Sequence, residues 1–208
     1  MNTRFVAIIG GSGSGKTWLA DRLAARLGAK AARLSLDDFY RDRAHLTLAQ
    51  RKRINFDHPR AIDWPLFLEV LEGLSKGLKV TVPRYDFTQS TRSGKQGVCR
   101  PKPWILIDGL WLLHHRECRR FMDLSIFVEC PASLRLKRRL ERDLKERARS
   151  VASVRKQFRE HTDPMHQLYV EPQANRAGQI VNSPISESDV DALARTLVSL
   201  FNSKPTQP

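Results

Sequence analysis

Residues 4–17 read RFVAIIGGSGSGKT, an apolar run followed by a glycine-rich turn. The turn matches the phosphate-loop pattern G-x-x-x-x-G-K-[ST], and a helical pattern follows it, which is the setting that this motif requires. Glycines let backbone N–H groups converge on a polyphosphate, and the N-terminus of a helix adds a favourable dipole. A glycine-rich turn without a ligand is the alternative. Because Lys and Thr stand in register after a strand, the motif predicts a site for a nucleoside triphosphate.

The residues of this loop divide the work of binding phosphate. Lys16 is expected to reach the β- and γ-phosphates, and the hydroxyl of Thr17 is expected to bind Mg²⁺. The residues expected to hold the nucleotide are Gly10, Gly11, Ser12, Gly13, Ser14, Gly15, Lys16 and Thr17.

Length and composition favour one α/β domain, alone or with a small insertion, over the 208 residues of the chain. No apolar stretch approaches the roughly 18 residues that span a membrane. The three cysteines are odd in number and lack metal-ligand spacing, so reduced thiols packed in the core of a cytoplasmic protein are expected. The first strand begins close to Met1, so we expect no signal or transit peptide.

The formal net charge of +14 is compatible with either a nucleic acid or a small phosphorylated ligand. Much of the excess lies in residues 135–149, where aromatic residues are sparse, so the stacking surface of single-strand binders is missing. A role directed at nucleotides is therefore favoured. A nucleic-acid-associated ATPase stays as an alternative.

Apolar runs alternate with helical patterns along the chain. Five strands are expected at 4–9, 33–36, 104–107, 124–128 and 179–181. Helices are expected at 15–27, after Asp63, at 131–149, 151–161 and 164–170, and after Ser186. This order predicts an α/β fold with a doubly wound, mostly parallel five-stranded sheet flanked by helices. Residues 79–102 interrupt it as a β-hairpin insertion. In such sheets the ligand lies beyond the carboxyl ends of the strands.

Two strand ends carry carboxylates. Asp37 and Asp38 follow the second strand, where one could accept a proton from a substrate hydroxyl or approach Mg²⁺; capping of a turn is an equally good interpretation of the spacing. Asp108 follows the apolar run 104–107 and has the position of a Walker B carboxylate. An Asp-Gly turn is its alternative, and the preceding apolar run favours the metal-associated role.

The segment 131–149 predicts a basic helix. Its arginines fall at intervals of three, four and seven and share one face, namely Arg135, Arg139, Arg142 and Arg149. A leucine seam lies on another face, made of Leu136, Leu140 and Leu144. A solvated face balanced by Glu141, Asp143 and Glu146 is the alternative. Because these carboxylates balance fewer than half of the positive charges, a cationic lid that closes over phosphates is favoured.

Two aromatic–carboxylate clusters, NFDHP at 55–59 and YDF at 85–87, suit a ribose and a flat base, although each is a weak signal alone. Together the motifs resemble the uridine–cytidine kinase family, within the phosphoribulokinase/uridine kinase group. The matching segments are GGSGSGKT at 10–17, SLDDFY at 35–40, NFDHP at 55–59, PRYDFT at 83–88, IDGL at 107–110 and RRLERDLKER at 138–147.

The resemblance implies a single P-loop NTPase domain over residues 1–208, with the hairpin 79–102 covering a nucleoside and a lid helix at 131–150. It implies phosphorylation of the 5′-hydroxyl of uridine or cytidine, with ATP or GTP as donor and Mg²⁺ as cofactor. It also implies a homo-oligomer, a dimer or a tetramer. A kinase for a sugar phosphate or a pantothenate-type alcohol remains an alternative.

The resemblance also implies roles for individual residues. Asp37 matches the general base, and the other catalytic positions are Lys16, Arg142 and Arg147. The metal-associated positions are Thr17, Asp37 and Asp108. Asp57 and Arg139 match ribose-binding positions. Further nucleoside-binding positions are Phe56, Tyr85, Phe87, Ser90, Arg149 and Gln157.

The sequence departs from the family pattern at three positions. Asp108 stands where Glu is usual, and Trp18 follows the phosphate loop where a small residue is usual. Ser90 stands where many members place a His that contacts the pyrimidine edge. A serine hydroxyl is shorter and can donate or accept a hydrogen bond.

Overall fold

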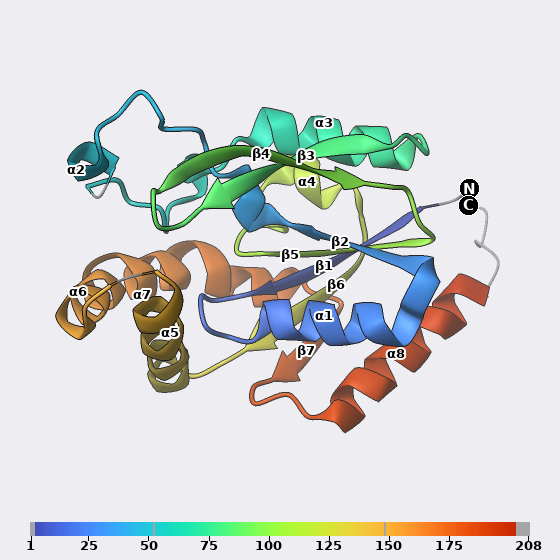
Figure 1. Ribbon diagram of the computed structural model, residues 1–208. Helices are drawn as coiled ribbons and strands as arrows, with labels where there is room; N and C mark the ends of the chain where they lie inside the picture. Colours follow the sequence, from blue (N-terminus) through green and yellow to red (C-terminus); the bar gives the residue numbers. More distant parts are fainter. Residues whose placement is uncertain (1–2, 52, 148, 203–208) are drawn as a thin grey trace.

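A parallel sheet forms the centre of the molecule in the computed structural model, which describes residues 3–51, 53–147 and 149–202. Its strands lie in the order β2-β5-β1-β6-β7, and each pair is parallel (Figure 1). Their bounds are β1 Arg4–Gly10, β2 Ala31–Ser35, β5 Trp104–Gly109, β6 Met122–Glu129 and β7 Gln179–Asn182. The predicted five-stranded sheet is confirmed, and all of its strands are parallel.

Helices cover both faces of the sheet. The helices α1 (Lys16–Leu27) and α8 (Glu187–Asn202) lie together on one face, and α3 (Trp64–Ser75) and α4 (Arg116–Arg119) lie on the other (Figure 1). Consequently β1 is buried on both sides: Val6 and Ile8 pack towards α1, whereas Ala7 and Ile9 belong to the core under α3. A strand covered on both faces is a near-continuous apolar run, as the sequence of β1 shows.

The hairpin insertion forms its own two-stranded antiparallel sheet from β3 (Val80–Asp86) and β4 (Thr91–Cys99). Both strands are longer than the β-type runs that the sequence predicts at 80–82 and 97–100. The hairpin lies on the same side of the main sheet as α3 (Figure 1). Two ion pairs of 2.9 Å tie it to the core, Arg84 with Asp38 and Arg92 with Asp63.

The segment after β6 forms a helical layer beside the carboxyl ends of the strands (Figure 1). The helix α5 spans Ala132–Glu146, with Pro131 as its N-cap, and α6 spans Val151–Gln157. Wider helical turns and the short α7 (Asp163–Met165) continue to Val170, and a 3₁₀ segment follows at Glu171–Arg176. The short helix α2 (Leu48–Arg51) lies in the polar stretch before α3.

Two expectations about the basic helix are wrong. Arg149 does not share its face, because α5 ends at Glu146. The helix buries Arg135, Arg139 and Asp143, whereas Leu144 of the leucine seam is 43% exposed. The polar face points inward because its arginines are paired there and line the phosphate end of the sheet. The helix expected over 131–149 is shorter and ends at Glu146; residue 148 lies outside the described residues.

The three cysteines are buried and unpaired with one another, as expected for core thiols. Within the described part of the chain, none of the helices combines the length and apolar character needed to cross a bilayer.

Candidate active site

The glycine-rich loop between β1 and α1 forms a backbone cradle. Gly13 and Gly15 adopt positive φ angles of 83° and 101°, which side chains with a Cβ rarely adopt. A Cβ on Gly13 would also lie 2.5 Å from the carbonyl oxygen of Arg135 in α5. Backbone conformation and close approach thus both require glycine at this position.

Lys16 lies buried at the floor of the cradle. Burial lowers the pKa of its ammonium group, and the nearby carboxylates of Asp37 and Asp108 oppose that shift. A buried ammonium with two carboxylates close by is poised to receive the negative charge of a polyphosphate.

Thr17 and Asp108 meet at the end of β5. The Thr17 hydroxyl donates a hydrogen bond of 2.8 Å to Asp108 Oδ2, and Arg33 forms a 2.9 Å ion pair with Oδ1 of the same carboxylate. Asp108 is almost fully buried. These hard oxygen donors fit Mg²⁺, which binds few protein ligands and keeps water and phosphate oxygens around it. They do not form a cage: among the described residues no group of three His, Cys, Asp or Glu side chains is placed to hold a metal.

The two aspartates after β2 have different environments. Asp38 accepts hydrogen bonds from Arg84 and from the backbone N–H of Tyr85, both in β3. Asp37 instead lines a cavity together with Lys16. The structure thereby separates two residues that the spacing alone left equivalent: Asp38 holds the hairpin, and Asp37, which the family resemblance had singled out, faces the candidate site.

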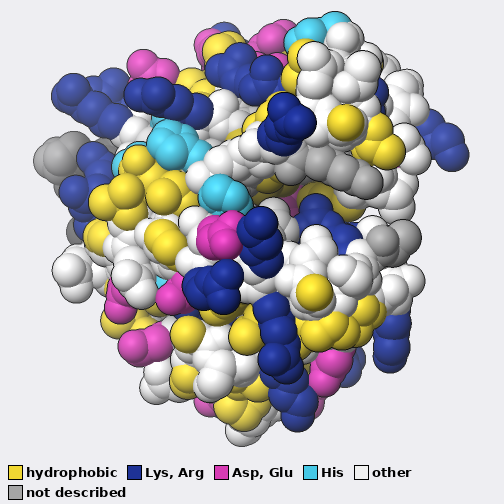
Figure 2. All heavy atoms as spheres, turned by 90° about the vertical axis from the view of Figure 1, so that its left-hand side faces the viewer, with side chains coloured by type: hydrophobic (Ala, Val, Ile, Leu, Met, Phe, Trp, Pro, Cys, Tyr) yellow, Lys and Arg dark blue, Asp and Glu magenta, His cyan; other side chains and the backbone are white. Residues whose placement is uncertain are grey.

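That cavity collects residues from six separate segments of the chain. Of the residues predicted to bind substrate or assist chemistry, it includes Ser12, Lys16, Asp37, Phe56, Asp57, Tyr85, Phe87, Ser90, Arg139, Arg142, Arg147, Arg149 and Gln157. Thr17 and Asp108 lie next to it rather than in its wall. The face that carries the carboxyl ends of the strands bears many Lys and Arg side chains (Figure 2).

Asp57 occupies the wall opposite the cradle, where it is buried. Its carboxylate accepts a hydrogen bond of 3.0 Å from Thr162 and lies 3.8 Å from Arg139 Nη1. Arg139 in turn donates to Ser12 (2.9 Å) and to Gln157 (3.0 Å). Arg139 therefore joins the phosphate cradle to the opposite wall.

Asp143 holds the arginines of this region together. It has no exposed surface, and its carboxylate oxygens lie 2.8 Å from Arg142 and 3.6 to 3.8 Å from three further arginines, namely Arg139, Arg147 and Arg149. Of the three acidic residues considered, Asp143 is the one for which the described part of the chain shows ion pairs with these arginines. Asp143 acts in the interior and not on a solvated face.

Aromatic rings form the remaining wall. Tyr40 contacts Phe56, Tyr85 and Phe87 with ring-centroid distances of 5.8, 5.0 and 6.4 Å. The Arg147 guanidinium lies 3.9 Å from the centre of the Phe87 ring, and burial, reinforced by Arg142, lowers its pKa to about 10. With the arginines in place the cavity measures about 50 Å³. A nucleoside is much larger, so its entry requires these side chains to move.

Three residues of the site were not predicted from the sequence. Tyr40 and Leu110 line the cavity, and Thr162 supports Asp57. Tyr40 follows Asp37 by three residues, so its proximity could have been noticed. Thr162 lies more than 100 positions from Asp57, and no local pattern indicates the contact.

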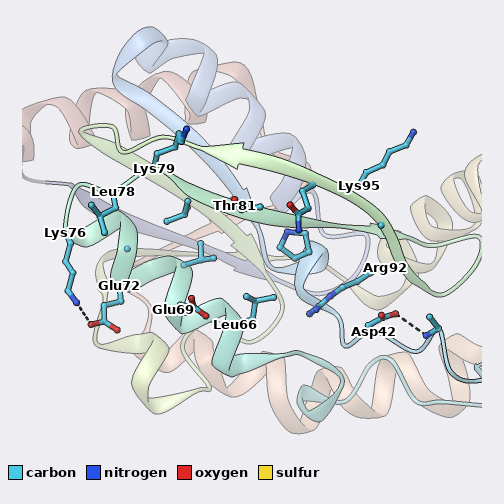
Figure 3. Close-up of a pocket in the computed structure, with 17 residues that line it drawn as sticks. Asp42, Leu66, Glu69, Glu72, Lys76, Leu78, Lys79, Thr81, Arg92 and Lys95 are labelled. Carbon is cyan, nitrogen blue, oxygen red and sulfur yellow. Dashed lines mark hydrogen bonds and ion pairs between the residues drawn. The ribbon is translucent and has the colours of Figure 1, made fainter.

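A larger hollow of about 860 Å³ lies elsewhere, between α3 and the outer side of the hairpin (Figure 3). Leu66, Glu69 and Glu72 of α3 face it from one side, and Thr81 and Arg92 of the hairpin from the other. It contains none of the predicted site residues.

The phosphate loop follows the central strand β1, and β2 and β5, on one side of β1, each end near a carboxylate. A separate cavity for an acceptor lies next to the loop. Together these features define the class of P-loop kinases. Within that class, the chain belongs to the Phosphoribulokinase / Uridine kinase family, whose model matches residues 5–190.

Individual relatives and structures agree with this assignment. A protein named uridine kinase from Staphylococcus haemolyticus is 41% identical over 86% of this chain and 87% of its own length. The structure of a putative fructose transport system kinase from Silicibacter has a TM-score of 0.71 at 22% identity, covering 86% of this chain and 90% of that one. Phosphoribulokinase from Rhodobacter sphaeroides has a TM-score of 0.62 at 16% identity, covering 91% and 74%. At such identities the structural likeness shows the shared fold alone.

Proposed function

We propose that this protein is a nucleoside kinase that transfers the γ-phosphoryl group of ATP to the 5′-hydroxyl of a pyrimidine ribonucleoside, uridine or cytidine. The 41% identity to a uridine kinase over most of both chains supports the acceptor class. The observation that carries the proposal is one cavity shared by Asp37, Lys16 and the Asp57–Arg139 pair, with aromatic rings along its wall.

In this proposal each group has a definite task. Asp37 accepts the proton of the 5′-hydroxyl while its oxygen attacks the γ-phosphorus, and ADP leaves with the bond to its β-phosphate oxygen broken. Lys16, Arg142 and Arg147 stabilise the charge on the phosphoryl group. Asp57 and Arg139 bind the ribose hydroxyls. Phe56, Tyr85 and Phe87 enclose the base, with Ser90, Arg149 and Gln157 as further contacts.

Mg²⁺ would supply charge neutralisation at the donor phosphates when bound. Thr17 and Asp108 would hold it, with water completing its coordination and Asp37 close by. Since Arg33 already pairs with Asp108, this carboxylate is held in place without the metal. GTP is the alternative donor. We further propose one kinase domain over 1–208, with 79–102 as a cover and 131–150 as a lid, in a cytoplasmic homo-oligomer.

A screen of acceptors tests the proposal. ADP release is measured with uridine, cytidine, purine nucleosides, deoxynucleosides, a sugar phosphate and pantothenate as acceptors. We expect turnover with uridine or cytidine. ADP release only with the sugar phosphate or pantothenate would overturn the proposal that the acceptor is a nucleoside. An Asp57→Ala variant that bound nucleoside as well as the wild type would do the same.

A matched pair of variants tests the general base. Asp37→Asn is expected to lower kcat by about 10²–10⁴-fold, because the proton acceptor is lost. Asp38→Asn, one residue further and bonded to the hairpin, is expected to lower it only a few-fold. Near-normal turnover in Asp37→Asn would contradict the assigned role.

A nucleic-acid-associated ATPase receives little support from the fold. Arg135 and Arg139 of the basic helix are buried and paired, so they are not available to a phosphodiester backbone. ADP release stimulated by RNA or DNA and suppressed by salt would revive that alternative.

A further inference from the structure

Trp18 is exposed beside the phosphate cradle, in the first turn of α1. It is 38% exposed, whereas Trp64, Trp104 and Trp111 are 9%, 1% and 0% exposed. A large aromatic ring is usually buried, since it contributes most of its free energy by leaving water. The position of Trp18 suggests a reason for its exposure.

The backbone of Trp18 belongs to the cradle itself. The Leu19 N–H donates to the Gly15 carbonyl at 2.9 Å, so the N–H groups of Lys16, Thr17 and Trp18 precede the first bond of the helix and remain available to phosphate. A triphosphate held by these groups has its γ end at the acceptor cavity, where Asp37 lies. Its nucleoside end must therefore leave the cradle away from that cavity, and Trp18 does not line the cavity.

The cradle is bordered on its other side by residues of α5 and of the turn after β7. A Cβ on Gly15 would lie 3.5 Å from Arg138 Nη1, 3.8 Å from Ser183 Oγ and 4.0 Å from Ile185 Cδ1. Arg138 donates to the carbonyl of Ser14 (3.1 Å) and to Ser183 (2.7 Å), which fixes it against the loop. Polar and apolar side chains thus border Gly15 on the side of the cradle that faces α5 and the segment before α8.

Arg22 holds the indole of Trp18 in place. Its guanidinium carbon lies 5.4 Å from the ring centre, and its Nε forms a 3.1 Å ion pair with Glu187 at the start of α8. A cation over one face of an indole orients the ring and leaves the rest of it free for a flat partner.

From this geometry we infer that Trp18 is the stacking surface for the purine base of the nucleoside triphosphate donor. The inference rests on the proposed function, which supplies the donor. Stacking on an indole uses the whole face of a base and not its hydrogen-bonding edge. Trp18 therefore selects purine over pyrimidine donors by ring size and accepts adenine and guanine alike.

Tryptophan fluorescence tests the inference without turnover. ATP is titrated against inorganic tripolyphosphate, which has the phosphates and no base, with Mg²⁺ present throughout. We expect ATP to quench the exposed indole and tripolyphosphate to leave its emission unchanged, and we expect the ATP response to disappear in Trp18→Phe. Equal responses to ATP and tripolyphosphate would overturn the inference.

Kinetics supply a second readout. Trp18→Ala is expected to raise the KM for ATP about 10- to 100-fold with little change in kcat or in the KM for nucleoside, and Trp18→Phe is expected to restore most of the affinity. Arg22→Ala should raise the KM for ATP more weakly. Its matched control is Arg26→Ala, because Arg26 also pairs with Glu187 (2.8 Å) but lies about two helical turns away from Trp18.

The outcomes separate this inference from the proposed function. A wild-type enzyme that phosphorylates nucleosides, with an unchanged KM for ATP in Trp18→Ala, overturns the inference alone. Quenching by ATP without any nucleoside turnover supports the inference and contradicts the proposed acceptor. A protein that binds no ATP at all contradicts both.

Discussion

The phosphate cradle and the acceptor cavity face each other across Arg139, yet they are built in opposite ways. The cradle is eight consecutive residues, 10–17, and its shape comes from glycine backbone conformations. The cavity takes side chains from segments as distant as Ser12 and Gln157, and its Asp57 is supported by Thr162 at 3.0 Å. A contiguous motif carries its own geometry, whereas the cavity exists only when the whole fold is formed.

The energetic basis differs as well. The cradle offers backbone N–H groups and one buried ammonium, so it needs little from neighbouring side chains. The cavity confines several arginines at close range, and their mutual repulsion has to be offset. Asp143 provides that compensation from the interior of α5.

Among the variants considered, Asp143→Asn should have the largest effect, and it acts on the arginines that line the cavity. Among the described residues, Asp143 is the one carboxylate within 4 Å of all four arginines. Removing its charge leaves buried positive charge uncompensated, which costs about 3–5 kcal/mol of unfolding free energy. Urea denaturation measures the loss, and added salt should recover part of it. Glu141→Gln, on the exposed face of the same helix, is the control and should change stability very little. Equal losses in the two variants would show that Asp143 is not the organising charge.

Gly13→Ala should distort the phosphate cradle and leave the acceptor cavity intact. The new Cβ would meet the Arg135 carbonyl oxygen at 2.5 Å in addition to its unfavourable φ of 83°. Backbone strain and overpacking together cost about 2–4 kcal/mol, and we expect ATP affinity to fall by about 30-fold or more. Isothermal titration calorimetry measures the affinity.

Gly94→Ala in the hairpin is the matched control for this variant. Its φ is also positive, at 73°, but its Cβ would meet nothing within 4 Å. It should lose about 1–2 kcal/mol of stability from the backbone conformation and keep its ATP affinity. An identical fall in ATP affinity for both glycines would show that contact with α5 is irrelevant to the cradle.

His166→Asn should have a smaller effect on stability, and it tests the packing of a side chain against the phosphate cradle. A Cβ on Gly11 would lie 2.8 Å from His166 Nδ1, so the imidazole packs directly against the loop. Burial, followed by the charge of Arg135, lowers the pKa of His166 to about 4, with Asp163 opposing and Lys16 reinforcing the shift. The histidine is therefore neutral in the folded protein near neutral pH.

The sign of the pH effect follows from this lowered pKa. Between pH 4 and 6.5 the unfolded chain binds the proton and the folded chain does not, so stability rises with pH through that window. At pH 5 the wild type should have lost about 1–2 kcal/mol from this group relative to pH 7.5, after allowance for partial exposure. Urea denaturation at both pH values should show a smaller difference for His166→Asn, with exposed His161→Asn as the control. No change in the difference would mean that His166 takes up its proton without unfolding.

The sequence was sufficient for the sheet, its helices and the cradle, because each is set by short-range pattern. Period, glycine placement and caps act within a few residues; Asp63, for example, caps α3 by accepting from the Leu66 N–H. The spacing alone could not distinguish Asp37 from Asp38, since both follow the same strand, and the prediction of Asp37 rested on the family resemblance. Only the arrival of Arg84 and Tyr85 from the hairpin separates them.

The basic helix shows the same limit. Its sequence places arginines on one face and leucines on another, and apolar burial alone would turn the leucines inward. The tertiary structure instead buries Arg135 and Arg139, because Asp163, Asp57 and Asp143 come from other turns and segments to pair with them. The sequence by itself therefore determined where a triphosphate can bind, through backbone geometry that is local. Which charges face the acceptor was decided only by the folded chain, because Coulomb pairing depends on distances between residues far apart in sequence.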